Sequence, residues 1–513
     1  MNTSRFIASH NGDAIPLTQI PQLSFSEFRE ATVQATVAGC RISALFGHTP
    51  PSALSPTSDM ALYVVLADAT QPLLRVAATR IEGGRFPSLT PDCPQAQLFE
   101  REIAEQFGLY PEGHPWLKPV RYHASYRPGV DAWGRPPGKA PLVGVTNYYR
   151  VEGDEIHEVA VGPVHAGVIE PGHFRFQCHG EHVFHLEISL GYQHRGAERT
   201  LVGGPNKRTM HTIETIAGDT SIGHGLAYCQ AIEALSGCHV SPRADAIRAI
   251  ALELERLANH TGDLGALAGD VGFLPTASYC GRLRGDFLNL SALICGNRFG
   301  RSLLRPGGVR FDLEEIRRQL CLERIVAALR DVKNAAELLF NSASVQARFE
   351  DVGVISQKNC QALGLVGLAA RACGVDDDIR RDFPTGIFRS KPVPVSTWKT
   401  GDVFARAFVR WLEIQRSVAF IQAILADPLA GSLHTEVGPL KPDHLAVSLV
   451  EGWRGEICHV ALTNAQGEFS RYKIVDPSFH NWMGLAMAMR DQQISDFPLC
   501  NKSFNLSYCG HDL

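Results

Sequence analysis

A loop near residue 165 carries the side chains with the clearest capacity for chemistry. The segment Gly162–Phe176 is rich in Gly and Pro, contains His165, Glu170 and His173, and runs into an alternating Phe-Arg-Phe. This composition predicts a tight turn that enters a β-strand. Its histidines could ligate a metal, transfer protons or bind a polar head group. The alternative is a glycine-rich hairpin whose histidines are surface residues.

The thirteen cysteines do not form a cluster-binding pattern. They are scattered singly, and no two of them are separated by two residues. Iron–sulfur clusters and soft metals are usually held by closely spaced thiolates, so we expect no iron–sulfur cluster in this chain. An odd number of cysteines in a long chain without a signal sequence indicates reduced thiols.

Length and composition are those of a soluble protein with several domains. The 513 residues are 45% hydrophobic and 20% charged, and the formal net charge is −4, which gives no positive field for nucleic acid. No apolar run reaches the roughly 18 residues of a membrane span. The segment Met1–Arg5 lacks the apolar core of a signal peptide. We therefore expect a cytoplasmic chain that contacts a membrane only through partner proteins.

The elements that must position the loop fall into two regions. Residues 1–123 predict a small α/β domain, with β-rich runs at 61–67 and 73–78 and a helix over 99–107. One face of this helix is charged and is expected to be solvated, with Glu100, Arg101, Glu102 and Glu105 on it. Residues 124–146 are rich in Pro, Gly and Arg and predict a linker.

Residues 147–513 predict a large, mainly α-helical domain. Ser241-Pro242 suits a helix N-cap and first turn, and apolar residues recur at helical spacing after it, as they do over 325–340 and 404–425. Strand-like segments come before these helices, and a hairpin is expected around Asn464–Gly467. The predicted fold class is α+β: a small α/β domain followed by a large helical bundle with peripheral β-hairpins.

Ordered motifs along the chain carry a family resemblance. The first domain, through motifs at residues 100–117, resembles the small hydrophilic subunit of respiratory complex I. The second domain resembles the large subunit shared by complex I and the membrane-bound, energy-converting NiFe hydrogenases, including those of formate hydrogenlyase. The motifs of this larger part are residues 162–176, 191–196, 224–228, 253–260, 305–308, 454–456 and 477–481. Fusion of both subunits into one chain is the hydrogenase-side arrangement.

The resemblance implies a nickel–iron site, but the residues at its ligand positions are unsuitable. In the family two pairs of thiolates hold the metals, one pair before the helix of His224 and one pair at the end of the chain. This chain has Ala217 and Thr220 at the first pair, and Ser507 and Gly510 at the second. Alanine and glycine offer no side-chain donor, and neutral hydroxyls are poor nickel ligands. We therefore expect no metal in this chain.

In the complex I subunit the corresponding cavity receives a quinone head group. The resemblance implies that a loop histidine and a nearby tyrosine hold it; here His165 is present, but the tyrosine position falls at or near Gly218. Polar side chains around the vacated pocket could hold water or move protons. The candidate catalytic residues are His165, Glu170, Asp219, Thr220 and His224, and the candidate cofactor-binding residues are Ala217, Gly218, Ser507 and Gly510.

The predicted function is that of a peripheral-arm subunit on the cytoplasmic side of a membrane-bound redox complex. It would couple electron transfer from an iron–sulfur partner to ion translocation, with quinone as one candidate acceptor. The implied partners are an iron–sulfur small subunit, a ferredoxin-like subunit and membrane ion-translocating subunits. Two alternatives remain: a structural coupler without catalysis, and a hydrogenase with unusual ligands.

Overall fold

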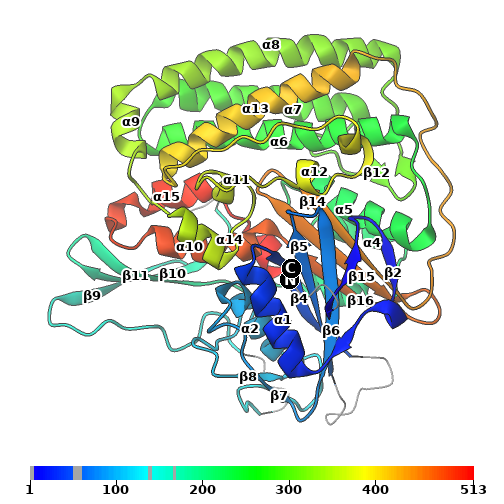
Figure 1. Ribbon diagram of the computed structural model, residues 1–513. Coiled ribbons are helices and arrows are strands. Elements are labelled where there is room, and N and C mark those ends of the chain that lie inside the picture. The colour runs from blue at the N-terminus through cyan, green and yellow to red at the C-terminus, as the bar shows by residue number, and fades with distance from the viewer. Residues whose placement is uncertain (1–4, 50–59, 137–140, 166–168) are drawn as a thin grey trace.

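The structure is a computed structural model that describes residues 5–49, 60–136, 141–165 and 169–513. Long helices form a layer above two sheets, and the N-terminal region lies below the bundle (Figure 1). The mixed composition, with a small N-terminal domain and a larger helical region, confirms the predicted α+β class. In the part of the chain described, no helix is both long enough and apolar enough to cross a bilayer.

The N-terminal region is built on a five-stranded sheet in which β1, β6, β5 and β4 are neighbours and β3 pairs with β6. Helix α1 begins in a capping box, in which the Ser24 and Glu27 side chains bind each other's backbone N–H. The strands predicted at 61–67 and 73–78 and the helix predicted at 99–107 are confirmed. The elements are β1 (Ile7–Ser9), β3 (Gln22–Leu23), α1 (Phe25–Val37), β4 (Arg41–His48), β5 (Met60–Asp68), β6 (Leu73–Ile81), β7 (Arg85–Pro87), α2 (Gln97–Phe107) and β8 (Tyr110–Glu112).

The charged face of α2 is buried, so the prediction of a solvated surface is wrong. The side chains of Glu100, Glu102 and Glu105 are all 0% exposed. Helix α2 lies between the two regions, where Glu102 accepts from the ammonium of Lys473 at 2.7 Å and Glu105 accepts from the backbone N–H groups of residues 120–122. Carboxylates can be buried here because several donors satisfy each of them.

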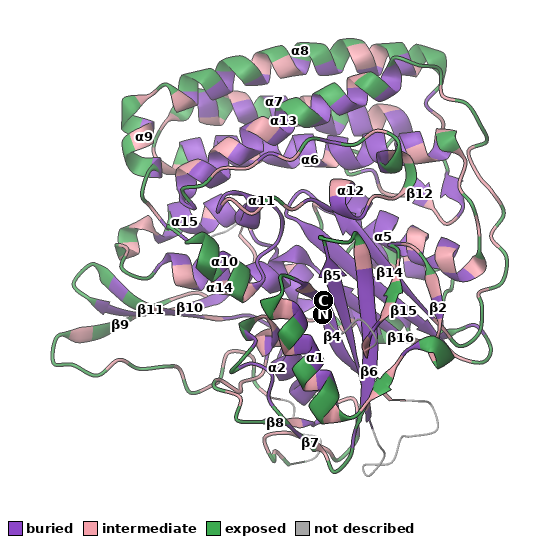
Figure 2. Cartoon of the chain, in the orientation of Figure 1, coloured by how far each residue is buried: buried purple, intermediate pink, exposed green. Residues whose placement is uncertain are grey.

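Four long helices make the bundle of the large region. They are α6 (Pro242–Asp270), α7 (Leu274–Cys295), α8 (Glu315–Phe340) and α13 (Val403–Leu425). The Ser241 hydroxyl accepts the N–H of Ala244, which confirms the predicted N-cap of α6. Helix α8 is the outermost of the four, and one of its faces is exposed while α6 is largely buried (Figure 2).

A four-stranded antiparallel sheet lies under the bundle and joins the two regions. Its order is β16–β15–β14–β2, with β14 (His444–Glu451), β15 (Glu456–Thr463) and β16 (Phe469–Val475). Strand β2 (Ala14–Pro16) comes from the N-terminal region and pairs with β14. The hairpin predicted around Asn464–Gly467 is confirmed, but every residue of β15 is buried, so this hairpin belongs to the core and not to the periphery.

The remaining elements surround the sheet. A three-stranded sheet of β9 (Ile156–Val161), β10 (His173–His179) and β11 (His182–Ser189) projects from the body (Figure 1). The described part of the predicted linker at 124–146 contains no helix or strand, and the division at 1–123, 124–146 and 147–513 stays a prediction. The other elements are α3 (Ala197–Leu201), α4 (Thr209–Ile213), α5 (Ser221–Ser236), β12 (Leu304–Arg305), β13 (Gly308–Val309), α9 (Ala343–Phe349), α10 (Gln357–Leu363), α11 (Gly367–Arg371), α12 (Ile379–Asp382), α14 (Pro477–Ala488), α15 (Phe497–Phe504) and α16 (Tyr508–Asp512).

Candidate functional site

The loop between β9 and β10 brings His165 against the C-terminal segment. The imidazole centroid lies 5.5 Å from the ring of Phe174 and 6.2 Å from that of Tyr508. Its Nε2 is buried and finds no hydrogen-bond partner among the residues that the structure describes, which leaves it available to another group. Residues 166–168 of the loop lie outside the described residues.

Glu170 ties the same loop to the last residues of the chain. Its carboxylate accepts the backbone N–H of Tyr508 at 3.2 Å and lies beside the thiol of Cys509. Burial, together with the negative charge of Glu170, raises the pKa of Cys509 to about 11. The thiol nearest the predicted ligand positions is therefore protonated at neutral pH, and a protonated thiol is a poor metal ligand.

Two arginines hold the C-terminal segment near the start of α5. Arg195 donates to the carbonyl of Ile216 at 3.0 Å and lies 3.5 Å from the carbonyl of Cys509. Arg454 donates to both carboxylate oxygens of Asp219, at 2.7 and 2.8 Å, and also to a backbone carbonyl just before the C-terminal helix. The structure thus places the two segments that the sequence singled out side by side.

Residues 217–220 form a tight, satisfied turn at the N-terminus of α5. The Thr220 hydroxyl donates to Asp219 at 3.0 Å and accepts the indole N–H of Trp453 at 3.2 Å, while Ala217 is fully buried. Burial would raise the pKa of Asp219, but the charge of Arg454 and its hydrogen bonds lower it below the usual value. Asp219 is therefore an ionised, partly exposed carboxylate at the edge of the site.

The second pair of positions consists of a hydroxyl engaged in capping and a glycine whose side-chain space is filled. The Ser507 hydroxyl caps α16 by accepting the N–H of Gly510 at 2.9 Å. A Cβ built on Gly510 would lie 2.6 Å from Cγ and 2.7 Å from Oδ2 of Asp476. The Asp476 carboxylate therefore takes the space into which a side chain at residue 510 would point.

Asp476 is held in place by His224, the fifth candidate catalytic residue. The His224 Nε2 lies 3.0 Å from Asp476 Oδ2, and its Nδ1 lies 3.0 Å from Nε2 of His459. Burial would raise the pKa of Asp476, but the hydrogen bond from His224 and the nearby charge of Arg454 lower it. Asp476 and His459 were not among the residues predicted from the sequence. Asp476 had a signal there, because it directly precedes the Pro477-Ser478-Phe479 motif.

All the predicted site residues thus surround one region, with His165 and Glu170 on its loop side. At the four predicted ligand positions two residues have no donor atom, and the Thr220 and Ser507 hydroxyls are already hydrogen-bonded. This donor set does not fit a pair of metals held by four thiolates. Among the described residues, no three His, Cys, Asp or Glu side chains are grouped as metal ligands.

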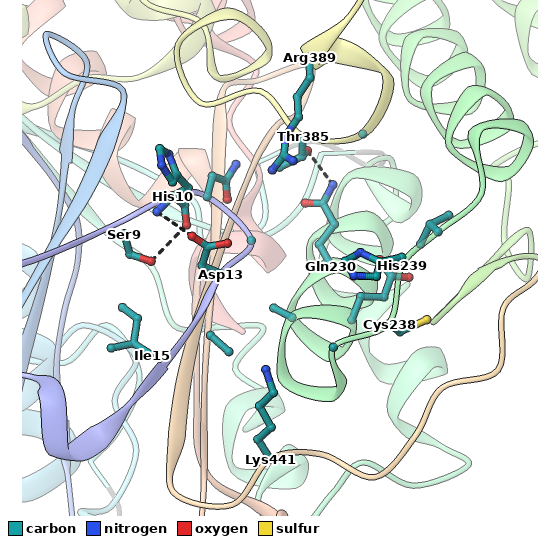
Figure 3. A pocket seen from close by; sticks show the side chains of 18 of the residues that line it. Ser9, His10, Asp13, Ile15, Gln230, Cys238, His239, Thr385, Arg389 and Lys441 are labelled. Atoms are coloured by element: carbon teal, nitrogen blue, oxygen red, sulfur yellow. Dashed lines mark hydrogen bonds between the residues drawn. The ribbon is translucent and has the colours of Figure 1, made fainter.

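One cleft lies beside this region and another lies away from it. A cleft of about 450 Å³ borders Asp219 and is lined by Asn259, Asp263 and Arg284 of α6 and α7. A second cleft, of about 720 Å³, lies between the N-terminal strands and the end of α5 (Figure 3). The second cleft contains none of the predicted site residues, whereas the first is bordered by Asp219.

Comparison with known proteins agrees with this architecture. Residues 270–439 match the family model of the respiratory-chain NADH dehydrogenase 49 kDa subunit, and residues 36–129 match that of the 30 kDa subunit. The membrane-bound sulfane sulfur reductase, an archaeal respiratory membrane complex, contains a chain with TM-score 0.66 at 22% identity; the match covers 71% of this chain and all of the other. The scaffold is that of a complex I-type large subunit.

Sequence relatives include hydrogenase and quinone oxidoreductase subunits. The carbon monoxide-induced hydrogenase of Rhodospirillum rubrum is 31% identical, over 68% of this chain and 97% of its own length. Hydrogenase-4 component G of Escherichia coli is 30% identical, over 82% of this chain and 75% of its own length. NADH-quinone oxidoreductase subunit 4 of Thermus thermophilus is also 30% identical, over 67% of this chain and 90% of its own length. The chain belongs to this family of complex I and membrane hydrogenase large subunits, with a 30 kDa-type domain fused to it.

Proposed function

We propose that this protein is a peripheral-arm subunit of a membrane-bound redox complex and that it works without a nickel–iron centre. It receives electrons from an iron–sulfur partner and couples their transfer to ion translocation in membrane subunits. The family supports the general role, because the relatives belong to respiratory and hydrogenase complexes of this type. The chain itself contributes the scaffold, the vacated pocket and the groups that bind protons there.

The observation that carries the proposal is the contact between Asp476 and Gly510. A missing ligand could in principle be replaced by a neighbouring side chain, but here an ionised carboxylate fills the place of one thiolate and is fixed by His224. At the other pair of predicted ligand positions, the Thr220 hydroxyl is already hydrogen-bonded and Ala217 offers only a buried methyl group. Both halves of the ligand set have therefore been replaced by a hydrogen-bonded structure.

The surroundings of the site support docking of an electron-donating partner. Gly218 is exposed, Cys509 is partly exposed, and the Asp219 side chain is 33% exposed. In our proposal the iron–sulfur small subunit covers this edge, a ferredoxin-like subunit feeds it, and membrane subunits hold the chain at the cytoplasmic face. No cofactor is bound by the chain alone, and quinone is a candidate acceptor at the closed interface.

Metal analysis of the complex tests the absence of the centre. The purified complex is expected to contain iron from its partner subunits but no stoichiometric nickel, and to show no hydrogen-dependent dye reduction. Nickel at one atom per chain together with hydrogen uptake would overturn the proposal and favour a hydrogenase with unusual ligands.

A second measurement separates an acceptor site from a structural coupler. The His165 Nε2, which has no partner among the described residues, and the cleft beside Asp219 favour an acceptor site. The variants His165→Ala and Asp219→Asn should therefore lower turnover of the complex by at least about tenfold, the effect of roughly 1.4 kcal/mol in the transition state. His179→Ala, on the exposed part of β10, is the control. Full activity in both site variants would favour the coupler.

A further inference from the structure

Four buried side chains form a continuous hydrogen-bonded row behind the site. Asp476 Oδ2 lies 3.0 Å from His224 Nε2, His224 Nδ1 lies 3.0 Å from His459 Nε2, and His459 Nδ1 lies 3.0 Å from the Tyr472 hydroxyl. None of the four residues is more than 1% exposed. They come from the start of α14, from α5, from β15 and from β16, so the sheet and the helix must pack together to assemble the row.

The direction of the donors in this row follows from its ends. The ionised Asp476 can only accept, so His224 donates from Nε2, and its Nδ1 is then an acceptor when the ring is neutral. His459 must therefore donate from Nε2, which leaves its own Nδ1 to accept from the Tyr472 hydroxyl. Every imidazole nitrogen has a hydrogen-bond partner when each ring carries one proton.

The same atoms also accommodate one added proton. If His224 is protonated on Nδ1, it donates to Asp476 and to His459 at once. His459 then carries its single proton on Nδ1 and donates to the oxygen of Tyr472, since a hydroxyl can accept as well as donate. One proton taken from water is the whole change, and no hydrogen bond between the rings is lost.

The neighbouring charges favour His224 over His459 as the place for this proton. His224 contacts a carboxylate directly, whereas burial and the adjacent His224 lower the pKa of His459 well below its usual value. The pair thus holds a single extra charge. The titratable or charged groups that face the row from neighbouring elements are Asp219, Arg454 and His480 around Asp476, Glu198 beside His459, and Tyr228, Cys229 and Cys458 around Tyr472.

We propose that His224 and His459 form a proton-loading pair, which takes up one proton when negative charge arrives at the adjoining vacated site. The inference rests on the proposed function, because the quinone-type acceptor proposed there, in the cleft beside Asp219 and reduced by the iron–sulfur partner, supplies that charge close to Asp476. His459 and Tyr472 are positioning residues. They give every ring nitrogen a hydrogen-bond partner when His224 carries the added proton. The pair binds a proton alone, and this binding requires no metal.

Proton uptake on reduction of the whole complex tests the pair. The purified complex, with a soluble quinone analogue added, is reduced with a chemical reductant in weak buffer, and an indicator dye follows the pH. His224→Gln, which removes the ring that holds the proton, should lose about one proton per chain of the uptake measured for the unchanged protein, since the pair stores a single charge. Tyr472→Phe, which keeps the ring and removes the terminal hydroxyl, should shift the pH at which uptake occurs to lower values. Tyr228→Phe, a buried ring 6.3 Å from Tyr472 and outside the row, is the control and should change neither quantity.

The outcomes distinguish this proposal from the wider one. Unchanged uptake and unchanged pH dependence in both His224→Gln and Tyr472→Phe, with the complex intact, would overturn the loading pair. If His224→Gln prevents assembly, Tyr472→Phe decides alone. Stoichiometric nickel would contradict the proposed function, and the metal content is measured separately from the proton count.

Discussion

Two polar clusters of this protein have similar residues but opposite surroundings. One is the charged belt of the bundle, centred on Glu413, which accepts from Arg371 at 2.9 Å, from Arg256 at 3.0 Å and from His260 at 2.8 Å. These belt residues are at most 2% exposed. The other is the vacated site, where Asp219 and Gly218 reach the surface and a cleft of about 450 Å³ opens beside them.

The difference separates a structural role from a chemical one. In the belt, burial would raise the pKa of Glu413, but the charges of Arg371 and Arg256 and the bond from His260 hold it well below its usual value, so its charge does not change near neutral pH. The site instead contains two linked imidazoles, one of them in contact with the Asp476 carboxylate, and at Asp219 it borders solvent. A cluster whose charges are fixed specifies how the helices pack. A cluster whose protonation can change is suited to couple electron transfer to ion translocation.

The largest expected effect comes from breaking the belt. Glu413→Ala leaves Arg371 and Arg256 buried without their shared carboxylate and should lower the free energy of unfolding by about 3–5 kcal/mol. Chemical unfolding of the purified protein measures it. Glu315→Ala, whose side chain is 63% exposed at the start of α8, is the control and should cost less than about 1 kcal/mol. If Glu413→Ala lowers the free energy of unfolding by less than about 1 kcal/mol, the structural role of the belt is contradicted.

A smaller effect is expected where the site is closely packed. Gly510→Ala places a methyl group 2.6 Å from the carboxyl carbon of Asp476 and should destabilise the protein by about 1–3 kcal/mol. The matched control is Gly218→Ala, because a Cβ there meets nothing within 4 Å, and its effect should stay within about 0.5 kcal/mol. Equal thermal unfolding temperatures for the two variants would show that Asp476 does not occupy the space beside Gly510.

The smallest effect concerns pH. Burial, together with the charge of Arg41, lowers the pKa of His480 on α14 to about 3. The unfolded chain binds this proton below about pH 6.5 and the folded chain does not, so stability is complete above pH 6.5 and falls as the pH drops toward 3. His480→Phe should make the dependence of the unfolding free energy on pH less steep by about one proton. An unchanged slope would mean that His480 is protonated in the folded protein.

Local patterns in the sequence predicted the elements that depend on local physics. Ser241-Pro242 begins α6 as expected, and the apolar spacing over 404–425 gives α13. The buried face of α2 could not be predicted in this way, because its charge partner Lys473 lies 371 residues further along the chain. A helix pattern shows which side chains share a face, but not what covers that face.

The same limit applied to the site. The family motifs located Ala217, Thr220, Ser507 and Gly510, and the structure places them around one region. The carboxylate that fills the ligand space comes from residue 476, and no spacing rule links that residue to His224 or Gly510. Its role depends on how the residue before α14 meets His224 of α5 and Gly510 of α16 in three dimensions, which a single sequence does not specify.

An experimental map of the assembled complex tests the central claim most directly. The claim is that the space between residues 217–220 and 507–510 contains protein side chains and no metal pair. We predict density for the Asp476 carboxylate against the Cα of Gly510, hydrogen-bonded to His224, with no heavier atom between the two segments. Strong metal density bridging these segments, with Asp476 turned away, would contradict the account.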